Sequence, residues 1–288
     1  MTTRYYRFAG MTVAMSMDAD CFFEKEYRLA HFTAEPSDDS LHLVFEKKKE
    51  LQPPCGRLVC STSAIHVYSD EDTDIRYMGC GLDTWEDALI RTQWHGKSVN
   101  VQVCETKIPG KISATLALDA LSVEHLLARN DGFVFHCSCI DHEGKAILFT
   151  APSQTGKSTQ AELWNKYRGS EIINGDRIAI RLVNGVLMAE GIPFAGSSQY
   201  CKNRSLPIEA IVYLAQAHDT SIRKLRGYEA FSRIWEGISV NVWDKEDMER
   251  VSHVVQKAAE LPVFYLSCTP DESAVVALHE ILAKQVNL

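Results

Sequence analysis

The sequence predicts a chain of mixed α and β structure, with a mainly β region over residues 1–112 and a core of strands and helices over residues 113–288. Two observations predict this division. Short alternating or apolar stretches, separated by turn-rich segments, fill the first region. Segments with helical periodicity follow in the second region, between apolar runs typical of buried strands. The expected fold class is therefore mixed, α+β to α/β.

The composition fits a folded protein and argues against one that binds polyanions. Of the 288 residues, 45% are hydrophobic and 24% are charged, close to the averages of globular domains. The net charge is −8, and the one dense basic run, residues 47–49, is flanked by Glu46 and Glu50. We expect no nucleic-acid partner.

Cysteine usage and hydropathy predict a cytoplasmic protein without a membrane partner. The nine cysteines form no C-x-x-C pair, the N-terminus lacks the layout of a signal peptide, and no apolar run approaches the length that spans a bilayer. Thiols in a reducing compartment stay free. Cys137 and Cys139 share one face of a strand, where burial in the core is a better interpretation than metal binding.

The first region is expected to contain several short strands. An acidic run at residues 70–74 lies between two of them, and we interpret it as a solvated turn rather than a metal site. The expected strands cover residues 11–15, 41–45, 58–60, 64–68 and 99–103.

The second region opens with a predicted helix over residues 113–129, because its leucines and valine recur at helical spacings. A hairpin follows, with strands at residues 133–140 and 146–149. Common P-loop NTPases place a helix before each parallel strand, so this hairpin indicates a different nucleotide-binding architecture.

Further strands and helices alternate to the end of the chain. Asn184-Gly185 is the strongest hairpin signal, and residues 269–272 read as a capping box with proline at the first helical position. The expected strands cover residues 171–174, 178–183, 186–189, 208–214 and 263–266, and the expected helices cover residues 159–168, 228–238, 245–261 and 269–284.

Residues 151–158 form a turn between a strand and a helix, and they have the features of a phosphate-binding loop. Backbone N–H groups can surround a polyphosphate, Lys157 can reach the terminal phosphates, and the Ser158 hydroxyl can hold Mg²⁺. Ala151 replaces the usual first glycine, so the loop must begin with a negative φ. The expected nucleotide-binding residues are Ser153, Gln154, Thr155, Gly156, Lys157, Ser158 and Thr159.

Two further residues are candidates for the chemistry. Asp176 follows the strand after the loop helix, where a carboxylate can bind Mg²⁺ or accept a proton from a hydroxyl; alternatively it caps a turn. His136 lies on the strand before the loop strand, and on its own a histidine in this setting is more often a core residue than a functional one. With Lys157 they are the expected catalytic residues, and Ser158 and Asp176 are the expected metal ligands.

Several segments together resemble the bacterial HPr-kinase-related proteins, which share a nucleotide-binding core with HPr kinase/phosphorylase and phosphoenolpyruvate carboxykinase. The resemblance is close over residues 132–217. The segments that carry it are His136-Cys137-Ser138, the loop ending in Gly156-Lys157-Ser158-Thr159, Ile173-Asn174-Gly175-Asp176-Arg177, residues 193–198 and residues 207–212.

The resemblance implies an ATP- and Mg²⁺-dependent kinase, in which His136 lies near the transferred phosphate. HPr kinase and the carboxykinases carry two adjacent acids where this chain has Gly175-Asp176. The chain also lacks a match to the C-terminal signature of HPr kinase, and it shows no sign of the substrate domain of the carboxykinases. Relatives of HPr kinase are often multimeric, so the resemblance also implies a homo-oligomer.

The expected reaction is phosphoryl transfer to a hydroxyl, such as a serine of a protein or peptide. Two alternatives remain: a kinase for a small metabolite, and a nucleotide-binding regulatory protein without turnover. Residues 197–204 are the candidate segment for acceptor contacts, and the cations that can stabilise the transition state are Lys202, Arg204, Arg223 and Arg226.

Overall fold

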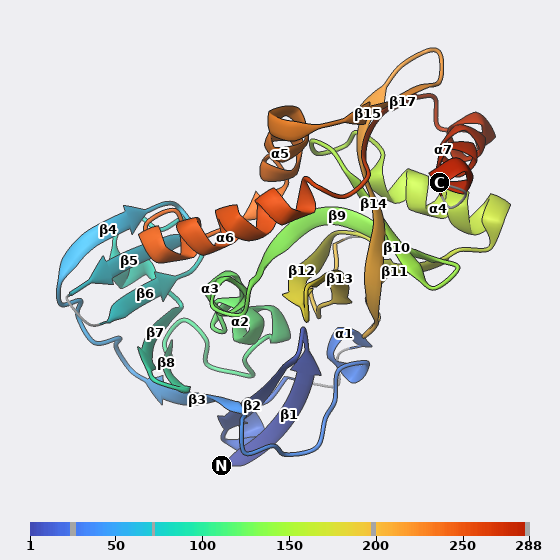
Figure 1. Cartoon of the computed structure of the whole chain (residues 1–288). Helices are drawn as coiled ribbons and strands as arrows, with labels where there is room; N and C mark the ends of the chain where they lie inside the picture. The colour runs from blue at the N-terminus through green and yellow to red at the C-terminus, as the bar shows by residue number, and fades with distance from the viewer. Residues whose placement is uncertain (24–26, 71–72, 197–199, 286–288) are drawn as a thin grey trace. The chain divides into compact units, whose positions relative to one another are not determined.

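The computed structural model describes residues 1–23, 27–70, 73–196 and 200–285. The chain divides into two compact units, Met1–Val123 and Glu124–Leu288. In Figure 1 the first unit runs from blue to green and the second from green to red. Each unit is built on its own large mixed sheet, which confirms the mixed α/β class.

The first unit contains a sheet with strand order β1-β2-β3-β8-β7-β6-β5-β4. β3 pairs in parallel with β2 and with β8, and the other neighbours are antiparallel. The expected strands are present, while β1, β6 and β7 were not expected. The bounds are β1 (Thr2–Phe8), β2 (Met11–Met17), β3 (Leu41–Lys48), β4 (Arg57–Ser61), β5 (Ile65–Ser69), β6 (Asp74–Met78), β7 (Ile90–His95) and β8 (Ser98–Cys104), with short helices η1 (Ala19–Cys21), α1 (Tyr27–Ala30) and η2 (Trp85–Asp87).

The prediction of a single helix over residues 113–129 is wrong. The structure has two short helices, α2 (Ala114–Asp119) and α3 (Val123–Ala128). Ser122 between them has a φ of 52°, a left-handed conformation that cannot continue an α-helix. Ser113 caps α2, because its hydroxyl accepts a hydrogen bond from the backbone N–H of Leu116 at 3.1 Å.

The sheet of the second unit is organised by two long strands, β9 and β14. The first half of β9 pairs with β12 and its second half with β10, while β14 pairs with β13 and then, in parallel, with β10 and β17. The bounds are β9 (Gly132–His142), β10 (Lys145–Thr150), β11 (Glu171–Asn174), β12 (Arg177–Val183), β13 (Val186–Gly191), β14 (Ser205–Gln216), β15 (Ser221–Leu225), β16 (Ile238–Ser239) and β17 (Val263–Cys268).

Both expected hairpins of this unit are confirmed. β9 and β10 are antiparallel, with His142 opposite Lys145. The β12–β13 turn is Asn184-Gly185, with φ values of 50° and 80°, as a type I′ turn requires. The β9–β10 hairpin places β10 beside its parallel neighbour β14, which in turn pairs in parallel with β17. Ligands bind at the carboxyl ends of such strands in open α/β sheets.

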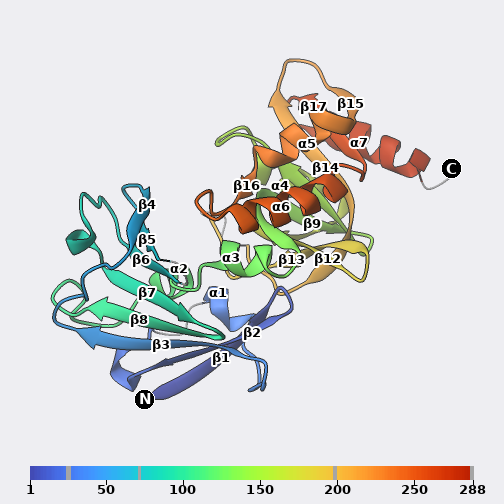
Figure 2. The same cartoon turned by 60° about the vertical axis from the view of Figure 1, so that its left-hand side comes forward.

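Helices cover both faces of this sheet. α4 (Lys157–Arg168) and α7 (Glu272–Gln285) pack on one face, and α5 (Gly227–Trp235) and α6 (Lys245–Ala258) pack on the other (Figures 1 and 2). The prediction of a capping box that begins at Thr269 is wrong. α7 begins at Glu272, and the Asp271 carboxylate accepts from the backbone N–H of Ser273 at 2.9 Å. No described helix is both long enough and apolar enough to cross a bilayer. Cys137 and Cys139 are fully buried free thiols in the core, as expected.

A buried ion-pair cluster joins α3 to α6. The Asp247 carboxylate is fully buried and accepts from His125 Nδ1 at 2.8 Å, Asn241 Nδ2 at 3.1 Å and Arg129 Nε at 3.3 Å. Asp244 caps α6 through the N–H of Asp247. Three potential metal-ligand atoms of this cluster lie within 4.8 Å of one another, but the Arg129 guanidinium already supplies positive charge there. The cluster is therefore structural.

We expect Asp247→Asn to lower the free energy of unfolding at pH 7 by about 2–3 kcal/mol, because it removes the buried carboxylate that pairs with the Arg129 guanidinium and accepts from His125 and Asn241. Burial raises the pKa of Asp247, but hydrogen bonds from His125 and Asn241 and the charge of Arg129 outweigh it, so the pKa is lowered. The stabilisation is then present above the ordinary pKa of about 3.9 and lost as the pH falls through the lower folded value.

Urea unfolding at pH 7 and pH 3 measures this difference, which should shrink in acid. Glu249→Gln is the matched control, because the Glu249 side chain on the same helix is 67% exposed. We expect it to change stability by less than about 0.5 kcal/mol. A pH-independent loss in Asp247→Asn would contradict the electrostatic explanation.

Candidate functional site

The candidate site begins where β10 ends at Thr150 and the chain turns into α4. The positive φ values of the loop fall on Gln154 (63°) and Gly156 (113°). Ala151 is not among the residues with positive φ, as expected for the residue that replaces the first glycine. Gly156 is the N-cap residue of α4 and has no side chain to cap it. The first N–H groups of the helix are thereby left to a ligand, and the helix dipole favours an anion.

Lys157 is folded into this loop. Its residue surface is 9% exposed, and Nζ donates to the carbonyls of Ala151 at 3.0 Å and Pro152 at 3.3 Å. Burial lowers the pKa of Lys157, while the negative charge of Asp176 acts in the opposite direction. Two carbonyls are weak partners for a buried ammonium, so the side chain is suited to an anionic ligand in the loop.

The first turn of α4 is fixed to β9. The Ser138 hydroxyl is buried and donates to the Lys157 carbonyl at 2.6 Å. Ser138 was not among the expected site residues. It stands two positions after His136 on the same strand, so strand alternation places both side chains on one face.

Asp176 and His136 contact each other directly. His136 Nε2 donates to Asp176 Oδ1 at 2.9 Å, and Arg177 Nε lies 3.4 Å from Oδ2. The hydrogen bond from His136 is the main reason that the pKa of Asp176 is lowered, and the charges of His136, Arg177 and Lys157 add to it against burial. Asp176 is therefore a carboxylate at neutral pH, available to a metal ion but weakly basic.

A local turn and a neighbouring loop position this carboxylate. Asn174 Oδ1 accepts from the N–H groups of Asp176 at 2.8 Å and Arg177 at 3.0 Å, and Asn174 Nδ2 donates to Phe194 O at 2.9 Å. A Cβ added at Gly196 would lie 3.0 Å from the Cβ and Cγ of Asp176. The asparagine two residues before the aspartate was a readable turn signal; the approach of Gly196 was not, because it depends on tertiary structure.

Ser158 links the loop to Asp176. Its hydroxyl donates to the carbonyl of Gly175 at 3.3 Å, one residue before the carboxylate. A serine hydroxyl and a single carboxylate are hard oxygen donors of the kind that Mg²⁺ takes from proteins, with water and phosphate oxygens completing its coordination. The residues present thus fit Mg²⁺.

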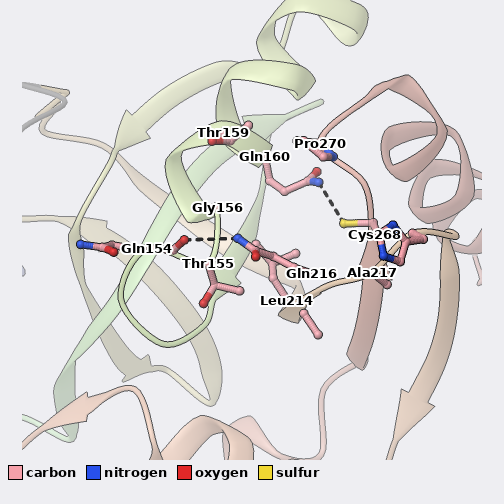
Figure 3. A pocket seen from close by; sticks show the side chains of 12 residues that line it. Gln154, Thr155, Gly156, Thr159, Gln160, Leu214, Gln216, Ala217, Cys268 and Pro270 are labelled. Carbon is pink, nitrogen blue, oxygen red and sulfur yellow. Dashed lines mark hydrogen bonds between the residues drawn. The ribbon is translucent and has the colours of Figure 1, made fainter.

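A cavity of about 680 Å³ opens beside the loop (Figure 3). Gln154, Thr155 and Gly156 belong both to the loop and to the cavity wall. The wall continues with Thr159 and Gln160 of α4, with residues 214–218, and with Cys268 and Pro270. The cavity lies at the ends of β14 and β17, and its volume is within the range of small-molecule sites.

The cations proposed for the transition state are placed elsewhere or already paired. Lys202 Nζ lies 2.5 Å from Glu171, and Arg204 lies 2.8 Å from Asp141, both near the start of β11 and away from Asp176 at its far end. Arg223 pairs with Glu229 at 2.6 Å. Arg226 lines a separate cavity between α5 and α6. Residues 197–199 of the candidate acceptor segment lie outside the described residues.

Comparison with known proteins finds likenesses among solved structures only, and they are distant. No protein-family model and no curated protein matches the sequence. Among solved structures, the chain is similar to the Hpr(Ser) kinase/phosphatase from Coxiella burnetii, with 10% sequence identity and a TM-score of 0.35. The match covers 53% of this chain and 97% of that one. A likeness at this level says nothing about substrates.

Proposed function

We propose that the unit Glu124–Leu288 is a nucleotide- and Mg²⁺-dependent phosphotransferase of the HPr-kinase-related type, which transfers a phosphoryl group from ATP to a hydroxyl. The observation that carries the proposal is the position of Lys157 Nζ, buried in an anion-favouring loop whose helix is linked through Ser158 and Gly175 to the His136–Asp176 pair. Phosphate binding and acceptor chemistry are then side by side.

Each residue has a role in this reaction. Lys157 exchanges its two loop carbonyls for phosphate oxygens and neutralises their charge. Asp176 and Ser158 hold Mg²⁺, which when bound neutralises phosphate charge and orients the transferred group. His136 holds Asp176 in place through its Nε2 hydrogen bond. Asp176 also orients the acceptor hydroxyl, since its lowered pKa makes it a poor proton acceptor in the ground state.

The exposure of the pair favours a large acceptor. The side chains of His136 and Asp176 are 41% and 28% exposed, so a hydroxyl carried by a protein or peptide can reach them from solvent. An enclosed metabolite site would require these groups to be buried. A serine of a protein or peptide is therefore the acceptor that we propose, with a small-metabolite kinase as the alternative.

Calorimetry of the wild-type chain with ATP, with and without Mg²⁺, tests the proposal. We expect binding that Mg²⁺ strengthens, accompanied by slow release of inorganic phosphate in the absence of an acceptor. Mg²⁺-dependent binding with no hydrolysis and no transfer to peptide libraries would instead favour a regulatory nucleotide-binding protein. Absence of ATP binding would contradict the proposed function altogether.

A further inference from the structure

A buried amide without a complete set of hydrogen bonds faces the cavity beside the loop. Gln160, on the first turn of α4, is 3% exposed. Its Nε2 donates to Cys268 Sγ at 3.3 Å, but among the described residues its Oε1 has no hydrogen-bond partner. Figure 3 shows the Gln160 side chain extending toward Cys268, with the hydrogen bond between them dashed. A buried acceptor without a donor is unfavourable, which indicates that a ligand supplies one.

The surroundings of this amide define the ligand by shape and polarity. Leu214, Ala215, Ala217 and Pro270 give the cavity apolar walls. The cavity is also lined by the polar side chains of Gln154, Thr155, Thr159, Gln160, Gln216 and His218. Apolar walls combined with hydrogen-bonding groups suit a flat heteroaromatic ring. Because the loop forms part of the same wall, a ligand with its phosphates in the loop places its remaining part in this cavity.

We infer that the cavity binds the adenine base of the nucleotide and that Gln160 Oε1 accepts a hydrogen bond from the exocyclic amine of that base. Adenine is favoured over guanine, because guanine carries a carbonyl at the corresponding position, where it would face the glutamine oxygen. The inference deepens the proposed function and rests on it. It makes Gln160 the residue that determines base specificity.

The test uses three probes with Mg²⁺: ATP, purine riboside 5′-triphosphate, which lacks the exocyclic amine, and inorganic tripolyphosphate. Wild-type protein should bind ATP about tenfold more tightly than the purine analogue, the effect of one good buried hydrogen bond. Tripolyphosphate should bind more weakly than both. In Gln160→Leu the two nucleotides should bind equally, while the affinity for tripolyphosphate is unchanged.

The control is Gln256→Leu, an exposed glutamine of α6 outside this cavity, which should retain the wild-type preference. Gln160→Leu removes an unsatisfied acceptor, so its melting temperature should not fall. If Gln160→Leu fails to fold, Gln160→Met replaces it. The comparison of ATP with the purine analogue in the wild type also tests the role of Gln160 without any variant.

The outcomes separate the inference from the proposed function. Equal wild-type affinities for ATP and the purine analogue would overturn the role of Gln160. Equal affinities for ATP and tripolyphosphate would overturn the base cavity, while leaving the phosphate-binding loop in place. If none of the three probes binds, the proposed function and the inference fail together.

Discussion

Replacing Lys157 by methionine is expected to weaken Mg²⁺-ATP binding and to lower phosphoryl transfer by about 10²–10³-fold, the usual effect of removing one positioned donor from a charged transition state. Methionine retains most of the aliphatic stem but cannot donate to phosphate oxygens. The loop itself should persist, since Ser138 holds the first turn of α4 through the Lys157 carbonyl, which the substitution leaves intact.

The same variant should not be less stable than the wild type. Burial lowers the pKa of Lys157, so the unfolded chain binds its proton more tightly than the folded chain does. The charge therefore costs stability at neutral pH, and that cost disappears as the pH rises through the folded pKa toward the ordinary value of about 10.4. A melting curve of Lys157→Met at pH 7 should lie at or above that of the wild type.

Lys145→Met is the matched control. Lys145 lies at the start of β10, where its half-exposed side chain pairs with Glu209 at 3.4 Å. ATP affinity and transfer should remain within about twofold of the wild type, as for a surface ion pair. Unchanged ATP binding in Lys157→Met would show that the loop does not bind phosphate.

The second large effect is expected from Asp176→Asn, which should remove the Mg²⁺ dependence of ATP binding and lower turnover by about 10³-fold. Asparagine has the shape of aspartate and can still accept from His136 Nε2, but it lacks the charge that holds a divalent cation. Calorimetry with and without Mg²⁺ measures the first effect, and transfer of a labelled phosphate measures the second.

The pH dependence of ATP binding by the wild type tests whether Asp176 stays ionised. Its pKa is lowered by the hydrogen bond from His136, so the carboxylate stays ionised from neutral pH to below the ordinary value of about 3.9. Mg²⁺-dependent ATP binding should therefore not weaken between pH 8 and pH 5 through protonation of Asp176.

Asp131→Asn is the control for Asp176→Asn. Asp131 lies at an exposed turn with a φ of 51°, which asparagine tolerates, so this variant should bind ATP and Mg²⁺ as the wild type does.

The sequence predicted the elements whose signals are local. The Asn184-Gly185 turn, the hairpin before the loop and the glycine at the start of α4 depend on conformations that single residues favour, and all are present. The break at Ser122 was missed because leucine periodicity continues across it, while a serine with positive φ is held by its surroundings rather than by its own preference. β6 and β7 were missed because polar residues such as Arg76 and Thr92 are buried within them.

In the candidate site too, residues with a local sequence signal were predicted, and residues brought together only by tertiary packing were not. The motif identified Lys157 and Ser158, and chain order suggested Asp176 at the end of a strand. Gln160 and Cys268 are separated by 108 positions, so their contact and the cavity around them follow only from the packing of α4 beside the end of β17. A glutamine inside a helix carries no sequence signal for a base-binding role.

β9 sets the spacing of the site. His136 and Ser138 lie two residues apart on this strand, about 6.8 Å along its axis, and one holds Asp176 while the other holds the first turn of α4. In the proposed reaction, backbone geometry therefore sets the separation between the phosphate-binding loop and Asp176. If the proposed function holds, segments that contact an acceptor can change without altering this strand, and substrate choice can evolve while the chemistry is kept.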